Sequence, residues 1–128
     1  MEVITQAWND DGEYLGLHAL LDVVQANDWT WHLEEFHGTT VPGAGVNALE
    51  LEERLTGGEP VSFAWDELLV FAAKVDQLID GRISAFMPEE AEPLLVLEAL
   101  DSIYWSFAAL DRHAPAAAVL DRVAALSD

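Results

Sequence analysis

The chain has 128 residues, and its 24 acidic residues against 5 basic ones give a formal net charge of −19 at pH 7. This length accommodates one domain, so we expect a single globular domain over residues 1–128. The 52% of hydrophobic residues exclude a disordered chain and predict a packed core. The charge argues against nucleic acid and membranes as partners, because so negative a field repels anionic surfaces and attracts basic proteins.

Three observations predict a cytoplasmic protein. The chain contains no cysteine, which excludes a disulfide framework and thiolate chemistry. Its start, MEVITQAWNDDGEY, lacks the basic and apolar segments of a signal peptide. No apolar stretch approaches the ~18 residues that a membrane-spanning helix needs.

The N-terminal region predicts a strand followed by a helix. Residues Glu2–Trp8 favour a short strand, and polar residues then interrupt it. Asp10, followed three residues later by Glu13, has the spacing of a capping box, which predicts the start of a helix that ends near Asn27. The apolar face of this predicted helix consists of Tyr14, Leu17, Leu20, Leu21 and Val24.

The next segments predict a strand, a loop and a second strand. Apolar and polar residues alternate from Trp29 to Phe36, and the phase reverses at Glu35, which indicates a β-bulge or the end of the strand. The stretch HGTTVPGAG at residues 37–45 predicts a loop. Residues 46–55 (VNALELEERL) fit either a strand or a short helix, and we favour the strand.

The most regular pattern lies in residues 61–87. Apolar residues recur there at three- and four-residue steps, which predicts a long amphipathic helix that organises the core. Ser62 or Asp66 is the expected N-terminal cap, and Gly81 is the expected end. Residues 82–87 then predict a short strand. The expected apolar face comprises Trp65, Leu68, Phe71, Ala72, Val75, Leu78 and Ile79.

The C-terminal third predicts two strands and a helix. Residues 94–100 and 103–109 are rich in β-formers, and Asp101 and Ser102 between them indicate a turn, although one helix through all of them is the alternative. Pro115 stands where a helix begins. Together the elements predict an α+β fold, with about three helices packed on a mainly antiparallel sheet in a single layered domain.

The sequence contains no catalytic signature. None of its serines lies in a GxSxG context, its glycines match neither a P-loop nor a GxGxxG fingerprint, and HExxH is absent. His32, Glu34 and His37 would form a metal site only if the predicted bulge brought His37 to the other two, and surface or structural histidines are the simpler interpretation. We therefore expect no enzyme activity, no cofactor and no metal ion.

Two segments carry a resemblance to known proteins. VDQLIDGRISAF at residues 75–86 and LEALDSIYWSF at residues 97–107 resemble a pattern of small, mostly uncharacterised bacterial α+β proteins. Some of these proteins are similar to immunity proteins of polymorphic toxin systems. The resemblance covers roughly the second half of the chain. It implies a sheet that holds the last strands with a helix packed beside it, and it carries over no catalytic residue.

The leading hypothesis is a stoichiometric binding protein of the immunity or antitoxin kind, which masks a basic site of a partner protein such as a nuclease toxin. The dispersed negative charge and the missing catalytic signature motivate it. Carboxylates are densest in residues 1–60, where 12 acidic residues accompany Arg54 as the sole basic one. The expected contact residues are Asp10, Asp11, Glu13, Glu34, Glu35, Glu50, Glu52 and Glu53, with Trp8 as the one tryptophan expected outside the core.

Two other functions stay open at this point. A phage-type nucleic-acid mimic that inhibits a defence complex would carry its carboxylates in a regular, phosphate-like row. A non-enzymatic structural domain would use its acidity for solubility alone, as proteins of a salt-adapted proteome do. A homodimer is compatible with each of these functions.

Overall fold

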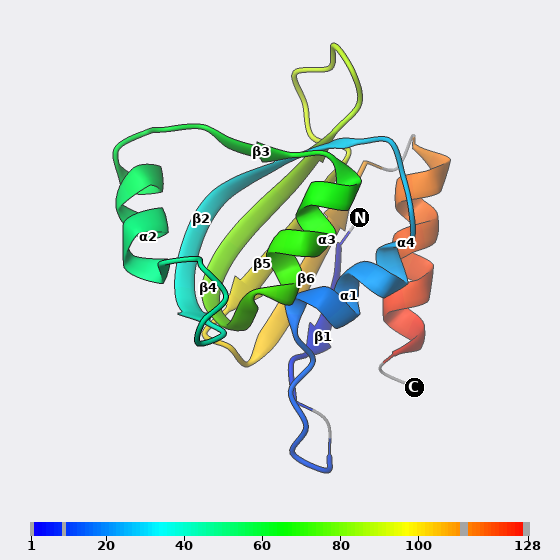
Figure 1. Cartoon of the computed structure of the whole chain (residues 1–128). Coiled ribbons are helices and arrows are strands. Elements are labelled where there is room, and N and C mark those ends of the chain that lie inside the picture. The colour runs from blue at the N-terminus through cyan, green and yellow to red at the C-terminus, as the bar shows by residue number, and fades with distance from the viewer. Residues whose placement is uncertain (1, 9, 111–112, 127–128) are drawn as a thin grey trace.

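A computed structural model describes residues 2–8, 10–110 and 113–126 of the chain. Within these residues the chain forms six strands and four helices, and the antiparallel sheet has the strand order β1-β6-β5-β4-β2-β3 (Figure 1). In chain order the elements are β1 (Glu2–Gln6), α1 (Leu17–Val24), β2 (Thr30–Thr40), α2 (Ala48–Thr56), β3 (Val61–Phe63), α3 (Trp65–Ala73), β4 (Val75–Phe86), β5 (Leu95–Leu100), β6 (Tyr104–Ala109) and α4 (Ala114–Ala125). The predicted α+β class is confirmed, with one helix more than expected.

The two faces of the sheet differ in what covers them. Along β5, Leu95 and Leu97 are buried, whereas Val96 between them is partly exposed. Trp105 and Phe107 of β6 pair with Ala99 and Leu97, so they lie on the same side of the sheet, and both are fully buried. We name the side that bears these buried residues the closed face, and the opposite side the open face. Figure 1 shows α1 and α3 in front of the closed face, with α4 at the end of the sheet where β1 lies.

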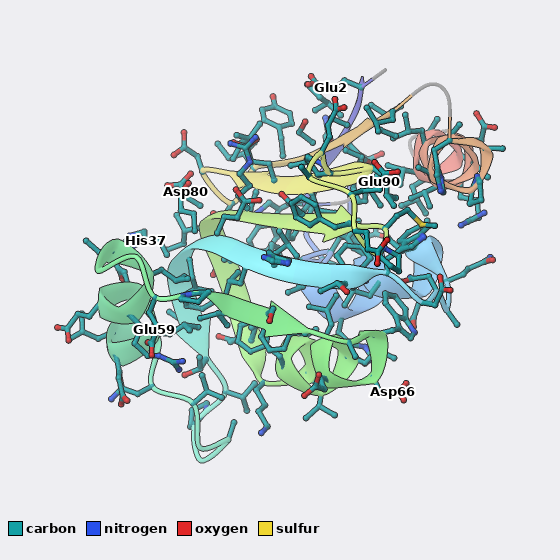
Figure 2. The ribbon with its side chains drawn as sticks, turned by 90° about the horizontal axis from the view of Figure 1, so that it is seen from above. Glu2, His37, Glu59, Asp66, Asp80 and Glu90 are labelled. Atoms are coloured by element: carbon teal, nitrogen blue, oxygen red, sulfur yellow. The ribbon has the colours of Figure 1, made fainter. Side chains whose placement is uncertain are left out.

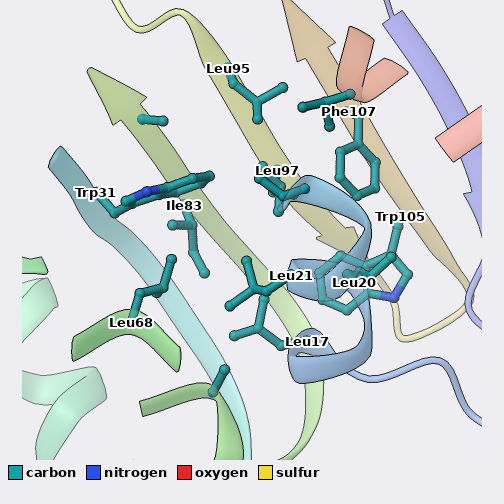
Figure 3. Packing of buried hydrophobic residues seen from close by; sticks show 14 of the residues in the cluster. Leu17, Leu20, Leu21, Trp31, Leu68, Ile83, Leu95, Leu97, Trp105 and Phe107 are labelled. Atoms are coloured by element: carbon teal, nitrogen blue, oxygen red, sulfur yellow. The ribbon is translucent and has the colours of Figure 1, made fainter. Parts of the chain in front are cut away.

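Helices α1, α3 and α4 supply the other half of the core. Their buried residues recur at three- and four-residue steps, as in the stripe of Leu17, Leu20, Leu21 and Val24 on α1. Each fully buried leucine or phenylalanine contributes about 1.5–3 kcal/mol. Figure 3 shows helix leucines packed against large side chains of the closed face, namely Trp31, Ile83, Leu97, Trp105 and Phe107.

Helix α4 also secures the end of α1. Arg122 donates from Nε to the Val23 carbonyl oxygen at 2.7 Å and from Nη2 to the Val24 carbonyl oxygen at 2.8 Å. The last turn of a helix leaves such carbonyls without an internal partner. One of the few basic side chains of the chain therefore holds two helices together.

Helix α2 covers an edge of the sheet. β3 pairs with residues 31–33 of β2, and β2 runs on to Thr40. Helix α2 packs beside this second half of β2 (Figure 1). Asn47 caps the helix by accepting the Glu50 N–H at 3.0 Å. A helix laid along a strand edge hides backbone groups that would otherwise pair with another chain.

Tyr14 stabilises an irregular point in β4. Opposite residues 37–38 of β2, the register of β4 steps from Asp80 to Leu78, so that Ile79 is an extra residue. The Tyr14 hydroxyl accepts the Leu78 N–H at 3.2 Å and donates to the Leu78 carbonyl oxygen at 3.3 Å. Burial is the main reason that the pKa of Tyr14 lies above its ordinary value.

The prediction of a long central helix is confirmed for α3, where Leu68, Phe71 and Ala72 are buried as expected, and is wrong on either side of it. Residues 61–63 form β3, and α3 ends at Ala73. Residues 75–86, where the helical periodicity continues, form the longest strand of the sheet. The reason is tertiary: β4 pairs along its whole length with β2 or β5, and this pairing overrides a local preference for helix.

The expected ends of that helix are wrong as well. Its N-terminal cap is Ala64, whose N–H donates to the Glu67 carboxylate at 2.9 Å, in place of Ser62 or Asp66. Gly81 lies inside β4, where an added Cβ would stand 2.7 Å from a buried leucine side chain. Glycine is therefore needed there for close packing and does not end a helix.

Two shorter predictions also need correction. Residues 46–55 form α2 and not a strand, because Asn47 caps a helix there and Leu51 buries one side of it. Residues 37–40, expected in a loop, extend β2. Helix α1 begins at Leu17, after a bridge between Trp8 and Tyr14, so the proposed capping box does not start it.

The other elements agree with the prediction. Strands β1, β5 and β6 lie where the sequence placed them, with Asp101 and Ser102 in the turn between the last two. Helix α4 has Pro115 in its first turn. Within the described residues, no helix combines the length and the apolar character needed to cross a membrane.

Candidate functional site

A β-bulge in β2 turns two neighbouring carboxylates toward the same side. Between the pairs that Leu33 and Glu35 form with β4, Glu34 is an extra residue. Leu33 and Phe36 are both buried, whereas Glu34 and Glu35 are both exposed. The phase reversal that the sequence shows at Glu35 is therefore a bulge, and it sets two carboxylates side by side.

These carboxylates line a cleft between α2 and the sheet. Helix α2 contributes Glu52, Leu55 and Thr56, which share one side of the helix, and β4 contributes Asp80 directly opposite His37. Figure 2 shows Asp80 and His37 at the same side of the molecule. We call this cleft of about 320 Å³ the acidic cleft, and its lining consists of Glu34, Glu35, Phe36, His37, Glu52, Leu55, Thr56 and Asp80.

The contacts within the cleft neutralise little of its charge. His37 Nδ1 lies 3.3 Å from a carboxylate oxygen of Glu52. The Glu34 carboxylate accepts a hydrogen bond from the Ser84 hydroxyl and lies 3.9 Å from Arg82 Nε. Such exposed pairs contribute at most about 1 kcal/mol each. The described residues that line the cleft include no lysine or arginine, so four carboxylates share it with one histidine, while Arg82, the cross-strand partner of Glu35, borders it.

Two other basic residues are engaged elsewhere. Arg54 of α2 forms an ion pair with Glu59, and this hydrogen bond raises the pKa of the guanidinium above its ordinary value. Arg122 is bonded to the end of α1. Neither side chain supplies a counter-charge to the acidic cleft.

The structure divides the predicted contact residues into three groups. Helical geometry turns residues two positions apart by ~200°, so Glu50 and Glu52 diverge where a strand would have aligned them. The groups are Glu34, Glu35 and Glu52 in the acidic cleft, Glu50 and Glu53 on other sides of α2, and Trp8, Asp10, Asp11 and Glu13 in the segment between β1 and α1.

Trp8 is exposed, as the sequence predicts. Its Nε1 donates to the Ser102 carbonyl oxygen at 2.8 Å, and its ring centroid lies 5.0 Å from that of Tyr14. The ring is therefore held beside the turn between β5 and β6. Its role as a binding anchor stays a prediction.

Asp80 is the carboxylate of the cleft that the sequence does not predict. The expected central helix placed it on a solvated polar side, whereas β4 brings it opposite His37. The contact arises from strand pairing between distant segments. No local pattern around Asp80 indicates it.

The two histidines of the candidate metal site make different contacts. The His32 ring packs against Phe86 with a centroid distance of 4.8 Å, while His37 faces Glu52. Over the described ranges, no group of three histidine, aspartate or glutamate side chains is arranged to hold a metal ion.

What the acidic cleft offers chemically is a set of acceptors for a cation. Carboxylates accept hydrogen bonds from ammonium and guanidinium groups, and one planar guanidinium can bond two oxygens at once. The described acidic residues are all at least partly exposed, and Figure 2 shows examples on several sides of the molecule, so the cleft lies within a negative surface.

Comparison of the chain with protein-family models, with curated proteins and with solved structures finds no match.

Proposed function

We propose that this protein is a stoichiometric binding protein whose acidic cleft masks a basic site of a partner protein, in the manner of an immunity protein or antitoxin. One observation carries the proposal. Four carboxylates from β2, α2 and β4 surround a cleft of about 320 Å³ in a chain of net charge −19. The cleft would receive an arginine or lysine side chain of the partner.

The magnitudes favour fast but salt-sensitive binding. Each exposed carboxylate–cation pair is worth about 0.2–1 kcal/mol, so the four carboxylates of the cleft alone bind a short cationic peptide with a Kd no tighter than about 1 mM at low salt. The field of the whole protein raises the association rate of a basic partner by about 10- to 10³-fold. Both effects weaken as salt shortens the Debye length.

The arrangement of the carboxylates supports a cleft for a protein side chain more than nucleic-acid mimicry. Glu34 and Glu35 are adjacent on one strand, Glu52 comes from a helix and Asp80 from another strand. A mimic of a phosphate backbone needs carboxylates in a long, evenly spaced row. This cleft gathers them around one point.

A peptide titration tests the cleft. The probe is the blocked peptide Arg-Arg-Gly-Ser-Gly-Ser-Ala in about 20 mM salt, where screening is weak. The variant Glu35→Gln/Glu52→Gln is expected to weaken binding about fivefold, because two acceptors of the cleft lose their charge. Both residues are exposed or half-exposed, so the fold tolerates the change.

The matched control is Glu89→Gln/Glu90→Gln in the loop between β4 and β5. Each double variant changes the formal net charge by the same two units, from −19 to −17. If both variants weaken peptide binding equally, only the overall charge matters. The acidity would then be explained by solubility and not by a binding cleft.

The inhibitory role is tested in cells. The product of the neighbouring gene is expressed alone and together with this protein, and growth and co-purification are measured. Growth arrest relieved by wild type but not by Glu35→Gln/Glu52→Gln is the expected result. A neighbour that is harmless and does not co-purify at low salt would count against the immunity role.

A further inference from the structure

Exposed apolar side chains gather at one end of the open face. Among the described residues, nine large apolar side chains are exposed, and five of them lie on β1, at the end of β5, at the start of β6 or in the adjoining segments. These five are Ile4, Trp8, Leu100, Ile103 and Tyr104. The other four are distributed over separate parts of the chain. A cluster of this kind on a monomer usually marks a contact surface.

The strand register makes the centre of this cluster contiguous. Leu100 pairs directly with Tyr104, and cross-strand partners lie about 5 Å apart at Cβ. Ile4 pairs with Ser106, which places it diagonally from Tyr104 on the neighbouring strand. All three side chains are on the open face, with exposed fractions of 52% for Ile4, 37% for Leu100 and 44% for Tyr104. We call these three residues the apolar patch.

The apolar patch and the acidic cleft are connected through the turn between β5 and β6. The Asp80 carboxylate, which lines the cleft, accepts the Asp101 N–H at 3.0 Å. Asp101 follows Leu100 directly in the chain. Along the open face, Glu98 of β5 stands opposite Arg82 of β4. One continuous surface therefore runs from carboxylates on β2 and β4 to apolar side chains on β5, β6 and β1.

We propose that the apolar patch is the second half of the interface with the basic partner, and that it receives an aliphatic or aromatic side chain flanked by arginine or lysine. The inference rests on the proposed function. Charge complementarity selects this occupant, because Glu2, Glu98 and Asp101 adjoin the patch. A second copy of this chain would bring another −19 against the same carboxylates.

The distance between the two halves defines a suitable probe. From β2 to β6 the sheet advances by three strand spacings, which is about 14 Å. A peptide segment of five residue steps reaches at most ~17 Å when extended. The peptide Arg-Arg-Gly-Ser-Gly-Ser-Trp therefore spans the surface with its arginines in the cleft and its tryptophan on the patch.

The experiment compares this peptide with Arg-Arg-Gly-Ser-Gly-Ser-Ala by NMR titration. We expect the tryptophan peptide to bind about tenfold more tightly to wild type. In Leu100→Ser/Tyr104→Ser this gain is lost, while the affinity for the alanine peptide is unchanged. Leu49→Ser/Val70→Ser, which removes two exposed apolar side chains of α2 and α3, is the matched control and keeps the gain. If a thermal melt shows that Leu100→Ser/Tyr104→Ser is unfolded, Ile4→Ser is used in its place.

Each of the other outcomes contradicts either the apolar patch or the proposed function, and the outcomes distinguish the two. Binding of both peptides with equal affinity, or a gain that survives Leu100→Ser/Tyr104→Ser, contradicts the apolar patch and leaves the cleft standing. Failure of both peptides to bind contradicts the proposed function itself. A wild-type dimer by light scattering that Leu100→Ser/Tyr104→Ser converts to a monomer would show that a second copy covers the patch, which overturns the assignment to a basic partner.

Discussion

The closed and open faces of one sheet carry opposite chemistry. On β6, Phe107 of the closed face is fully buried, whereas Tyr104 of the open face is 44% exposed. The closed face holds the aromatic and aliphatic residues that drive folding. The open face ends in a carboxylate-lined cleft on one side and in exposed apolar residues on the other. The residues that stabilise the fold and the residues that we propose bind a partner therefore lie on opposite sides of the same strands.

The largest effect should separate the two faces on a single strand. Phe107→Ala removes a fully buried ring and should lower the free energy of unfolding by about 3–5 kcal/mol, because it leaves a cavity. Tyr104→Ala on the open face should cost less than about 1 kcal/mol. Urea denaturation of both variants measures this, and similar losses would remove the distinction between the faces.

A smaller effect should appear at Gly38 of β2, which lies close to the backbone of β4. An alanine Cβ at Gly38 would collide with the Gln77 carbonyl oxygen, and the backbone of Leu78 lies next to it. Gly38→Ala should therefore lower the free energy of unfolding by about 1–3 kcal/mol. Gly16→Ala, where only the Tyr14 ring lies in ordinary contact, is the control for thermal denaturation. Equal melting temperatures for the two variants would contradict the tight pairing.

Tyr14 links the segment before α1 to the bulge of β4, and its effect should depend on pH. Its pKa is raised by burial, so the folded state favours the neutral phenol. The stability that this group contributes is fully present below the ordinary pKa of 10.0 and is lost as pH rises from there through the folded-state pKa.

Tyr14→Phe tests this assignment. At neutral pH it should cost about 1 kcal/mol, because two hydrogen bonds to Leu78 disappear. The difference in free energy of unfolding between wild type and Tyr14→Phe, measured by urea denaturation, should narrow above pH 10. Tyr104→Phe, measured in parallel, is the control. A difference that widens with rising pH would contradict a raised pKa of Tyr14 in the folded state.

The smallest expected effect is the loss of folding stability caused by repulsion between the carboxylates of the acidic cleft. Four carboxylates in one cleft repel one another, so Glu35→Gln/Glu52→Gln should raise the free energy of unfolding by about 0.5 kcal/mol at low salt and by less at high salt. Glu34→Gln should instead lower it, since Ser84 and Arg82 lose a charged partner. Loss of stability in the double variant would mean that those carboxylates support the fold.

Local patterns in the sequence were sufficient for some elements and misleading for others. Alternation and turn residues predicted β1, β5 and β6, and the phase reversal at Glu35 indicated either a bulge or the strand end, of which the structure has the bulge. The helical periodicity of residues 61–79 was correct for α3 and misleading on either side of it, because pairing with β2 places residues 61–63 and 75–86 in the sheet. Residues 46–55 were ambiguous between the two periods, and the edge of β2 favours a helix there.

The candidate site shows the same limit. The density of acidic residues pointed to Glu34, Glu35 and Glu52, which the fold brings together. Density alone does not separate them from Asp10 or Glu53, which lie elsewhere. Asp80 and the apolar patch depend on strand register and on which face the helices cover. Strand register and helix coverage are features of the tertiary structure, which local sequence patterns do not reveal.

We propose that the acidic cleft, and not the negative surface as a whole, receives the cations of a partner. Amide NMR chemical shifts, recorded while Arg-Arg-Gly-Ser-Gly-Ser-Ala is added in about 20 mM salt, test it most directly. We expect saturable shifts centred on the amides of Glu35, His37, Glu52 and Asp80. Shifts centred on Asp10, or spread evenly over the exposed carboxylates, would contradict it.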